Sequence, residues 1–241
     1  MKEIFERWFW PDKFVRRVLR SLLIVPIAML IWPRVIPFQI LELWRVHGSP
    51  VSWLTATLPL FAWGVGTTAL IIFHKRKSPM QMPFFPEDIL REGAVISAAA
   101  GIAEEITFRW LFFFESIILL KAANFLFFGF LGFGILEWVH LHVLGPVANF
   151  TTFHFLENFV FHSSGWAVGA GMLASNASFR NGHGHLGSLA LMNSWCLGMY
   201  LFWITFAFGL PIAILAHFLY DFLIYGVVYC YVLHRRPHDA W

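Results

Sequence analysis

Ionisable residues at helical spacing inside apolar stretches are the first feature of this sequence that could do chemistry. Glu104, Glu105 and Arg109 lie between the apolar runs 94–103 and 110–114. Residues four apart share a helix face, so Glu105 and Arg109 are predicted to form an ion pair. Glu104 lies about 100° away around the helix and has no such partner, which suits a general base that activates water. The alternative is a structural ion-pair network that holds helices together.

Two further polar clusters lie downstream. The Asn-Gly pair and the glycines between residues 180 and 184 predict a turn or a helix start, which would give His183 and His185 access to a cavity. His217 and Asp221 are four apart in an apolar helix, so the carboxylate is expected to hydrogen-bond one imidazole nitrogen and to orient the other. A core histidine with its hydrogen bonds satisfied is the alternative for His217, and for His185 it is the favoured interpretation.

The composition places these charges in a membrane. Of the 241 residues, 59% are hydrophobic and 13% are charged, and the mean hydropathy is +0.67. A soluble domain carries about 25% charged residues, so this chain has too little polar surface to coat one. Soluble globular, disordered and fibrous classes are therefore excluded. Because an ionisable side chain at membrane depth costs about 3 kcal/mol, each one is a candidate functional residue.

The apolar runs predict an all-α fold, a polytopic integral membrane helical bundle of about six to eight transmembrane helices around a polar cavity. A spanning helix needs about 20 apolar residues. The expected helical segments are 21–33, 51–73, 87–120, 122–144, 148–174, 187–207 and 211–234. The segment 148–174 carries several polar residues, and a re-entrant or cavity-lining element is its alternative interpretation.

Basic residues gather beside the apolar segments, although the net charge is only +3. They cluster within residues 2–20, at 75–77 and at 235–236. Because Lys and Arg are enriched in cytoplasmic loops, this pattern predicts a multi-pass integral membrane protein with a cytoplasmic N-terminus. Membrane lipid is an expected partner, since basic clusters attract anionic headgroups, and no nucleic-acid partner is expected. The sequence does not define an oligomeric state.

The chain resembles the CPBP family of intramembrane endopeptidases, also called the Abi family, which includes the type II CAAX prenyl proteases. The resemblance lies in three motifs that occur in order: Glu104-Glu105-x-x-x-Arg109, Phe179-x-x-x-His183 and His217-x-x-x-Asp221. It implies peptide-bond hydrolysis in a cavity open to the cytosol and to lipid, with a lipidated protein or a leader peptide as substrate. Within the single membrane domain 1–241, residues 1–86 would form N-terminal spans and a basic loop, and residues 87–234 the CPBP-like catalytic core.

The resemblance also implies roles for individual residues. Glu104 and His183 would activate the water, and His217 with Asp221 would form or support the oxyanion site. Glu105 and Arg109 would hold the motif helix in place. No cofactor is required in this mechanism. In the competing metalloprotease interpretation, zinc would be bound by Glu104, His183 and His217.

Two features depart from the family pattern. The interval between Glu104 and His183 is longer than in bacterial members, so the polar insert at 145–175 is either an extra span or a substrate-binding feature. Residues 180–182 replace the small apolar residues that are usual between Phe and His in the second motif, and His185 is therefore the reserve candidate for His183. A non-enzymatic transporter or bacteriocin-immunity-type protein, with the buried charges binding ions or packing helices, is the alternative function.

Overall fold

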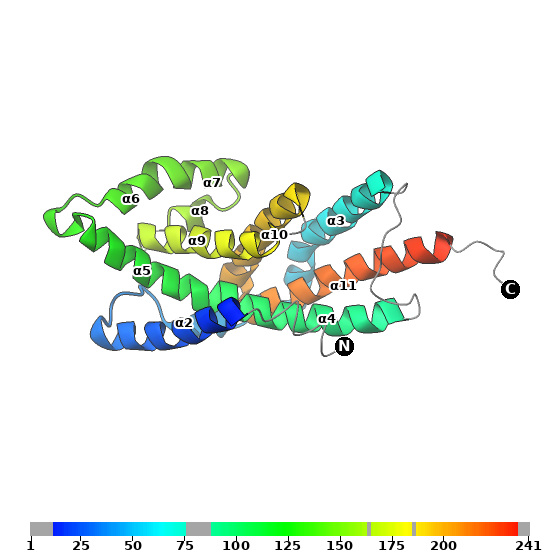
Figure 1. The fold of residues 1–241 in the computed structure, drawn as a ribbon, viewed down its shortest axis with the longest axis horizontal. Helices are drawn as coiled ribbons and strands as arrows, with labels where there is room; N and C mark the ends of the chain where they lie inside the picture. The colour runs from blue at the N-terminus through cyan, green and yellow to red at the C-terminus, as the bar shows by residue number, and fades with distance from the viewer. Residues whose placement is uncertain (1–11, 76–87, 163–164, 185–186, 236–241) are drawn as a thin grey trace.

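The computed structural model describes residues 12–75, 88–162, 165–184 and 187–235 (Figure 1). Over these ranges the chain forms helices joined by turns, and no strand occurs in them. The α-helices are α2 (Asp12–Ile31), α3 (Pro50–Lys75), α4 (Ile89–Glu104), α5 (Phe112–Leu126), α6 (Ile135–Val139), α7 (Gly145–Thr151), α8 (Glu157–Val160), α9 (Trp166–Gly182), α10 (Ser188–Phe208) and α11 (Leu210–Arg235). Two short 3-10 turns are η1 (Ile40–Trp44) and η4 (Gly129–Leu131), and two π turns are η3 (Glu105–Leu111) and η5 (His140–Leu144).

Three helices are long and apolar enough to cross a membrane. They cover Pro50–Phe73, Ser188–Phe208 and Leu210–His234, and they coincide with three of the predicted spans. Together with the composition, they indicate a membrane protein. For the described part of the chain, the predicted total of six to eight spans is not confirmed beyond these three helices.

Two predicted segments are not continuous helices. The segment 122–144 is interrupted after Leu126 by a turn in which Phe128 and Gly132 adopt left-handed backbone conformations, with φ of 63° and 85°. The segment 148–174 is interrupted after Thr151, and the polar insert consists of α7, the short helix α8 and the first half of α9. Hydropathy misses the first break because residues 127–134 are only Phe, Leu and Gly. The second break lies among the polar residues that had suggested an element other than a simple span.

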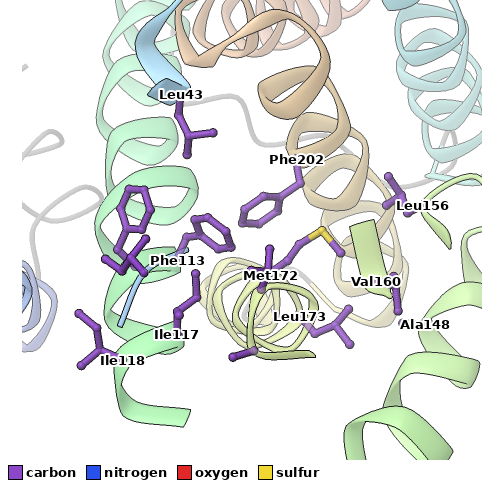
Figure 2. Packing of buried hydrophobic residues seen from close by; sticks show 14 of the residues in the cluster. Leu43, Phe113, Ile117, Ile118, Ala148, Leu156, Val160, Met172, Leu173 and Phe202 are labelled. Carbon is purple, nitrogen blue, oxygen red and sulfur yellow. The ribbon is translucent and has the colours of Figure 1, made fainter. Parts of the chain in front are cut away.

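The largest hydrophobic cluster joins α5, α9 and α10. Figure 2 shows Phe113 and Ile117 of α5 facing Met172 of α9 and Phe202 of α10, all fully buried. Gly171 allows this close approach, because a Cβ there would lie 2.7 Å from a side-chain carbon of Ile117. Helices α5, α9 and α10 therefore form a packed scaffold on one side of the molecule.

Helix α2 is attached to this scaffold through a buried carboxylate. Glu115 on α5 accepts a hydrogen bond from the Ser21 hydroxyl at 2.7 Å and pairs with Arg20 at 2.9 Å. Arg17, one turn earlier on α2, reaches Ser178 of α9 at 3.1 Å. These contacts account for an acidic side chain that would be costly to bury alone.

Small residues let α11 pack closely against α4. A Cβ at Gly101 of α4 would lie 3.1 Å from the backbone oxygen of Ile214 and 3.1 Å from the backbone nitrogen of Phe218. At Gly93, nearer the start of α4, a Cβ would lie 2.6 Å from the ring of Tyr225. The two helices are therefore nearly in backbone contact, and the end of α4 lies beside the first third of α11.

Candidate functional site

His217 lies at the centre of a cluster of carboxylates where α4 meets α11. Its Nδ1 is 2.8 Å from Oε1 of Glu105. Its Nε2 is 3.5 Å from Oδ2 of Asp221 and 3.9 Å from Oε2 of Glu104. An ionised carboxylate only accepts hydrogen bonds, so Nδ1 of His217 carries the proton that it donates to Glu105. The first and third motifs therefore share one site, although they lie far apart in the sequence.

The predicted ion pair between Glu105 and Arg109 is confirmed. Nη1 of Arg109 lies 3.1 Å from Oε1 of Glu105, and both side chains are completely buried. The guanidinium also lies 4.2 Å from the ring centre of Phe179, at cation–π distance. Because the same Glu105 oxygen accepts from His217, Glu105 connects the basic groups of α11 and η3.

The residue that orients His217 differs from the sequence-based expectation. Asp221 was expected to make the short hydrogen bond, but in the structure Glu105 makes it at 2.8 Å and Asp221 lies at 3.5 Å. Residue spacing identified only Asp221, which lies one turn from His217 on α11, as a partner. The contact with Glu105 depends on the packing of α11 against α4, which no local spacing encodes.

A π turn carries the first motif. At its end, the N–H of Phe112 donates to the carbonyl of Thr107, five residues earlier. The Phe108 carbonyl accepts a hydrogen bond from the Ser175 hydroxyl of α9. Single π turns within α-helices occur frequently at functional sites. Here the turn also ties the motif helix to α9, the helix that ends at His183.

His183 lies at the C-terminal end of α9, beside the carboxylate cluster. Its Nδ1 donates to the Phe179 carbonyl at 2.9 Å, so Nε2 is the nitrogen left to accept a proton. The Phe179 ring lies 4.8 Å from the His183 ring and 6.2 Å from the His217 ring. Asp221 interacts electrostatically with both His183 and Glu104. The reserve candidate, His185, lies outside the described residues.

The carboxylates of the cluster differ in exposure. The side chains of Glu104 and Asp221 are 22% and 27% exposed, whereas that of Glu105 is completely buried. A water molecule or a substrate therefore has access to Glu104 and Asp221 but not to Glu105. Glu105 is therefore enclosed by groups of the chain itself, whereas Glu104 and Asp221 are open to a further group.

A second polar network includes Tyr220, the residue before Asp221. It was not part of the predicted site. The Trp63 indole N–H donates to Oδ1 of Asn193 at 2.8 Å, and the Asn193 amide donates to the Tyr220 hydroxyl at 3.1 Å. Tyr220 immediately precedes Asp221 on α11. These bonds join α3, α10 and α11, so they fix the side of α11 that faces away from α4.

The cluster contains the donor types that zinc prefers, imidazole and carboxylate. Among the described residues, however, no three His, Cys, Asp or Glu side chains are arranged so that they could hold a metal ion. Both ring nitrogens of His217 face carboxylates of the chain itself.

Comparisons of the chain with known protein families, with characterised proteins and with solved structures find no match. Over the described residues the protein is all-helical, with three apolar helices of membrane length. It carries a cluster of Glu, Arg, His and Asp side chains in which Glu105, Arg109 and His217 are buried. The resemblance to the CPBP family rests on the motif residues.

Proposed function

We propose that the protein is a multi-pass intramembrane endopeptidase of the CPBP type, with a cytoplasmic N-terminus and a polar cavity among six to eight spans. It would cleave a membrane-associated protein or peptide, such as a prenylated CAAX-type protein or a leader peptide. One observation carries this proposal: two partly exposed carboxylates, Glu104 and Asp221, face Nε2 of a buried histidine, His217. The structural ion pair of Glu105 with Arg109 does not explain why Glu104 and Asp221 are also present.

In this mechanism, Glu104 is the general base. Its carboxylate removes a proton from a water molecule as the water oxygen bonds to the substrate's carbonyl carbon, a contribution of about 10²- to 10⁴-fold for a positioned base. Negative charge then develops on the carbonyl oxygen. His217, as an imidazolium with Glu105 at Nδ1 and Asp221 near Nε2, donates from Nε2 to this oxygen. The loss of one such donor typically costs about 10²- to 10³-fold.

The remaining steps use Glu104 and His183. The proton taken from water is shared with Nε2 of His183, whose other nitrogen is already held by the Phe179 carbonyl. When the C–N bond breaks, this proton is delivered to the departing amine, so the hydrolysis is balanced without a further reactant. Glu105 contributes by accepting the Nδ1–H of His217 and so orienting the ring, and Arg109 contributes by pairing with Glu105.

A transporter or an immunity-type protein is the second candidate. The observation that favours it is the complete burial of Glu105 and Arg109, whose contacts join η3 to α9 and α11 and would stabilise helix packing without any reaction. In such a protein Glu104 would bind an ion or contribute to packing, and its loss would not affect any cleavage.

Both candidates are tested with purified protein in proteoliposomes. The substrates are membrane-anchored peptides, one prenylated at its C-terminus and one with a leader sequence, and mass spectrometry identifies the products. Ion flux is recorded in parallel. We expect cleavage at one peptide bond, abolished by Glu104→Ala and unaffected by Glu42→Ala, an exposed residue outside the cluster. Ion flux without cleavage of either peptide would favour the transporter.

A chelator distinguishes the two forms of the peptidase. Cleavage that continues in the presence of a strong chelator and stops in Glu104→Ala supports the metal-free mechanism. If cleavage stops in chelator and returns when zinc is added, Glu104, His183 and His217 become the ligands, and the zinc supplies Lewis acidity.

A further inference from the structure

A cavity of about 610 Å³ lies outside the candidate site, bordered by α9, α10 and the segment from α6 to α7. Its volume is within the range of sites for small molecules, about 300–1,000 Å³. The lining side chains are apolar except at His140, Thr151 and Arg180. In Figure 1, α6 and α7 lie over α9 along this side of the molecule. The cavity therefore has the lining expected of a site for an apolar ligand.

The face of α9 that lines the cavity is long enough for one acyl chain. The residues that α9 contributes extend from Trp166 to Arg180, at intervals of three or four that place them on one helix face. At 1.5 Å per residue, this face is about 21 Å long. The hydrocarbon layer of one bilayer leaflet is about 15 Å thick, so a single lipid chain fits along α9.

The two ends of the cavity are chemically different. At one end, Arg180 lies 5.8 Å from the Trp195 ring and donates from Nη2 to the amide oxygen of Asn181 at 2.8 Å. No carboxylate within the described ranges forms an ion pair with Arg180. At the other end, the ring of His140 lies 6.3 Å from that of Trp166, and Nε2 of His140 donates to the Val160 carbonyl at 2.9 Å. One end thus presents a cation, and the other is aromatic.

The side of the cavity opens onto an apolar surface. Leu144 and Val147 line the cavity, yet they are 51% and 58% exposed. Trp138 and Phe150, on the same helical segment, are also exposed. An apolar surface of this kind is suited to contact with lipid, so a chain can enter the cavity directly from a bilayer.

We propose that this cavity binds one acyl chain of an anionic glycerophospholipid, with the headgroup phosphate paired with Arg180. The guanidinium matches a phosphate in charge and in hydrogen-bond geometry. The second acyl chain would remain in the bilayer against Leu144 and Val147. This site is separate from His217 and its carboxylates, and it does not depend on the proposed peptidase function.

Native mass spectrometry of the full-length protein in detergent tests the site. The probes are phosphatidylglycerol and phosphatidylcholine with identical chains, and oleate as a single-chain anion. We expect one phosphatidylglycerol per protein, bound about fivefold more tightly than phosphatidylcholine, because one basic side chain near the membrane surface has an effect of this size. Arg180→Gln should remove the preference, whereas Arg45→Gln, an exposed arginine outside the cavity, should keep it.

A second pair of variants tests the chain-binding part. Ala170 is buried and lines the cavity, so Ala170→Phe should reduce binding of both phospholipids, whereas Ala122→Phe on the exposed side of α5 should not. Equal binding of the two phospholipids by the wild-type protein would overturn the proposal. So would an Arg180→Gln variant that behaves like Arg45→Gln, or binding of oleate without binding of phosphatidylglycerol. If Ala170→Phe does not fold, the comparison of Arg180→Gln with Arg45→Gln still tests the proposal.

Discussion

Glu105 holds two basic side chains, Arg109 and His217, with one carboxylate oxygen. All three side chains are buried, and breaking a buried pair by removing one partner typically costs about 3–5 kcal/mol. We expect Glu105→Ala to lower the free energy of unfolding in detergent by about this amount. Glu104→Ala should lower it by less than about 1 kcal/mol, because the Glu104 carboxylate is partly exposed. Equal losses in both variants would contradict the separation of positioning and reacting roles.

At this scale, residue spacing predicted one contact and missed another. The pair of Glu105 with Arg109 follows from helical geometry within a single segment, and the structure contains it. The hydrogen bond of Glu105 to His217 joins residues 112 positions apart. Such a contact depends on how two helices pack together, so it cannot be predicted from residue spacing in a single sequence.

Among the helices of the candidate site, the contact of α4 with α11 leaves little room for added volume. A Cβ at Gly101 would lie 3.1 Å from backbone atoms of α11, which cannot rotate away. We expect Gly101→Ala to destabilise the protein by about 1–3 kcal/mol and to lower activity, since it pushes Glu104 away from His217. Thermal unfolding and cleavage rates measure the two effects.

The matched control is Gly66→Ala on α3, where a Cβ would meet nothing within 4 Å. It should be neutral or stabilising by up to about 1 kcal/mol, because alanine is the better helix former. If Gly101→Ala is as stable and as active as Gly66→Ala, the close packing of α4 against α11 is wrong.

The hydrogen bond that α9 makes to the π turn is a second test at this scale. Ser175→Ala removes the hydroxyl that donates to the Phe108 carbonyl, a loss of about 1 kcal/mol in stability. Because the π turn carries Glu105 and Arg109, we also expect a lower cleavage rate. Ser52→Ala removes an exposed hydroxyl that bonds only to Ser49 at the start of α3, so it should leave the cleavage rate unchanged. If Ser175→Ala is destabilised but cleaves at the wild-type rate, the hydrogen bond to the π turn does not contribute to catalysis.

Apolar length predicted α3, α10 and α11 because each is a single run bounded by charges or by a break. It did not predict the π turns, since the residues within them are ordinary helix formers. It also joined α5 to α6 across 127–134, where the left-handed conformation of Phe128 ends the helix. A turn made of apolar residues has the same hydropathy as the helices beside it, so a hydropathy profile does not reveal it.

At the scale of the whole molecule, three helices have an end at the same end of the long axis, which we call the shared pole. The last residues of α3 and α11 and the first residues of α4 lie at the same end of the long axis (Figure 1). Two of these ends carry Lys75 and Arg235, each beside a basic cluster. We expect both to face the cytoplasm, in accord with the enrichment of basic residues there.

Cysteine labelling in whole cells measures this topology. In a variant without Cys196 and Cys230, Lys75→Cys and Arg235→Cys should both be protected from an impermeant thiol reagent and become labelled once the membrane is opened. Labelling of one position in intact cells, with protection of the other, would contradict the shared pole.

The number of crossings was the least predictable property. Helix α4, the π turn and α5 form one helical stretch from Ile89 to Leu126. At 1.5 Å per residue it is about 57 Å long, nearly twice the 30 Å of a bilayer's hydrocarbon core. A count of apolar runs assigns one span to such a stretch, whereas its depth and tilt depend on the helices packed around it.

Whether Glu104 is the base that activates water can be measured by replacing its carboxylate with an amide of the same shape. The rate of cleavage of a membrane-anchored peptide is measured for the wild type, for Glu104→Gln and for Glu157→Gln, whose carboxylate is 58% exposed and lies outside the cluster. We expect both variants to unfold at the wild-type temperature. The cleavage rate should fall at least about 100-fold in Glu104→Gln and stay unchanged in Glu157→Gln. A Glu104→Gln variant that cleaves at the wild-type rate would contradict the role of Glu104 as the base that activates water.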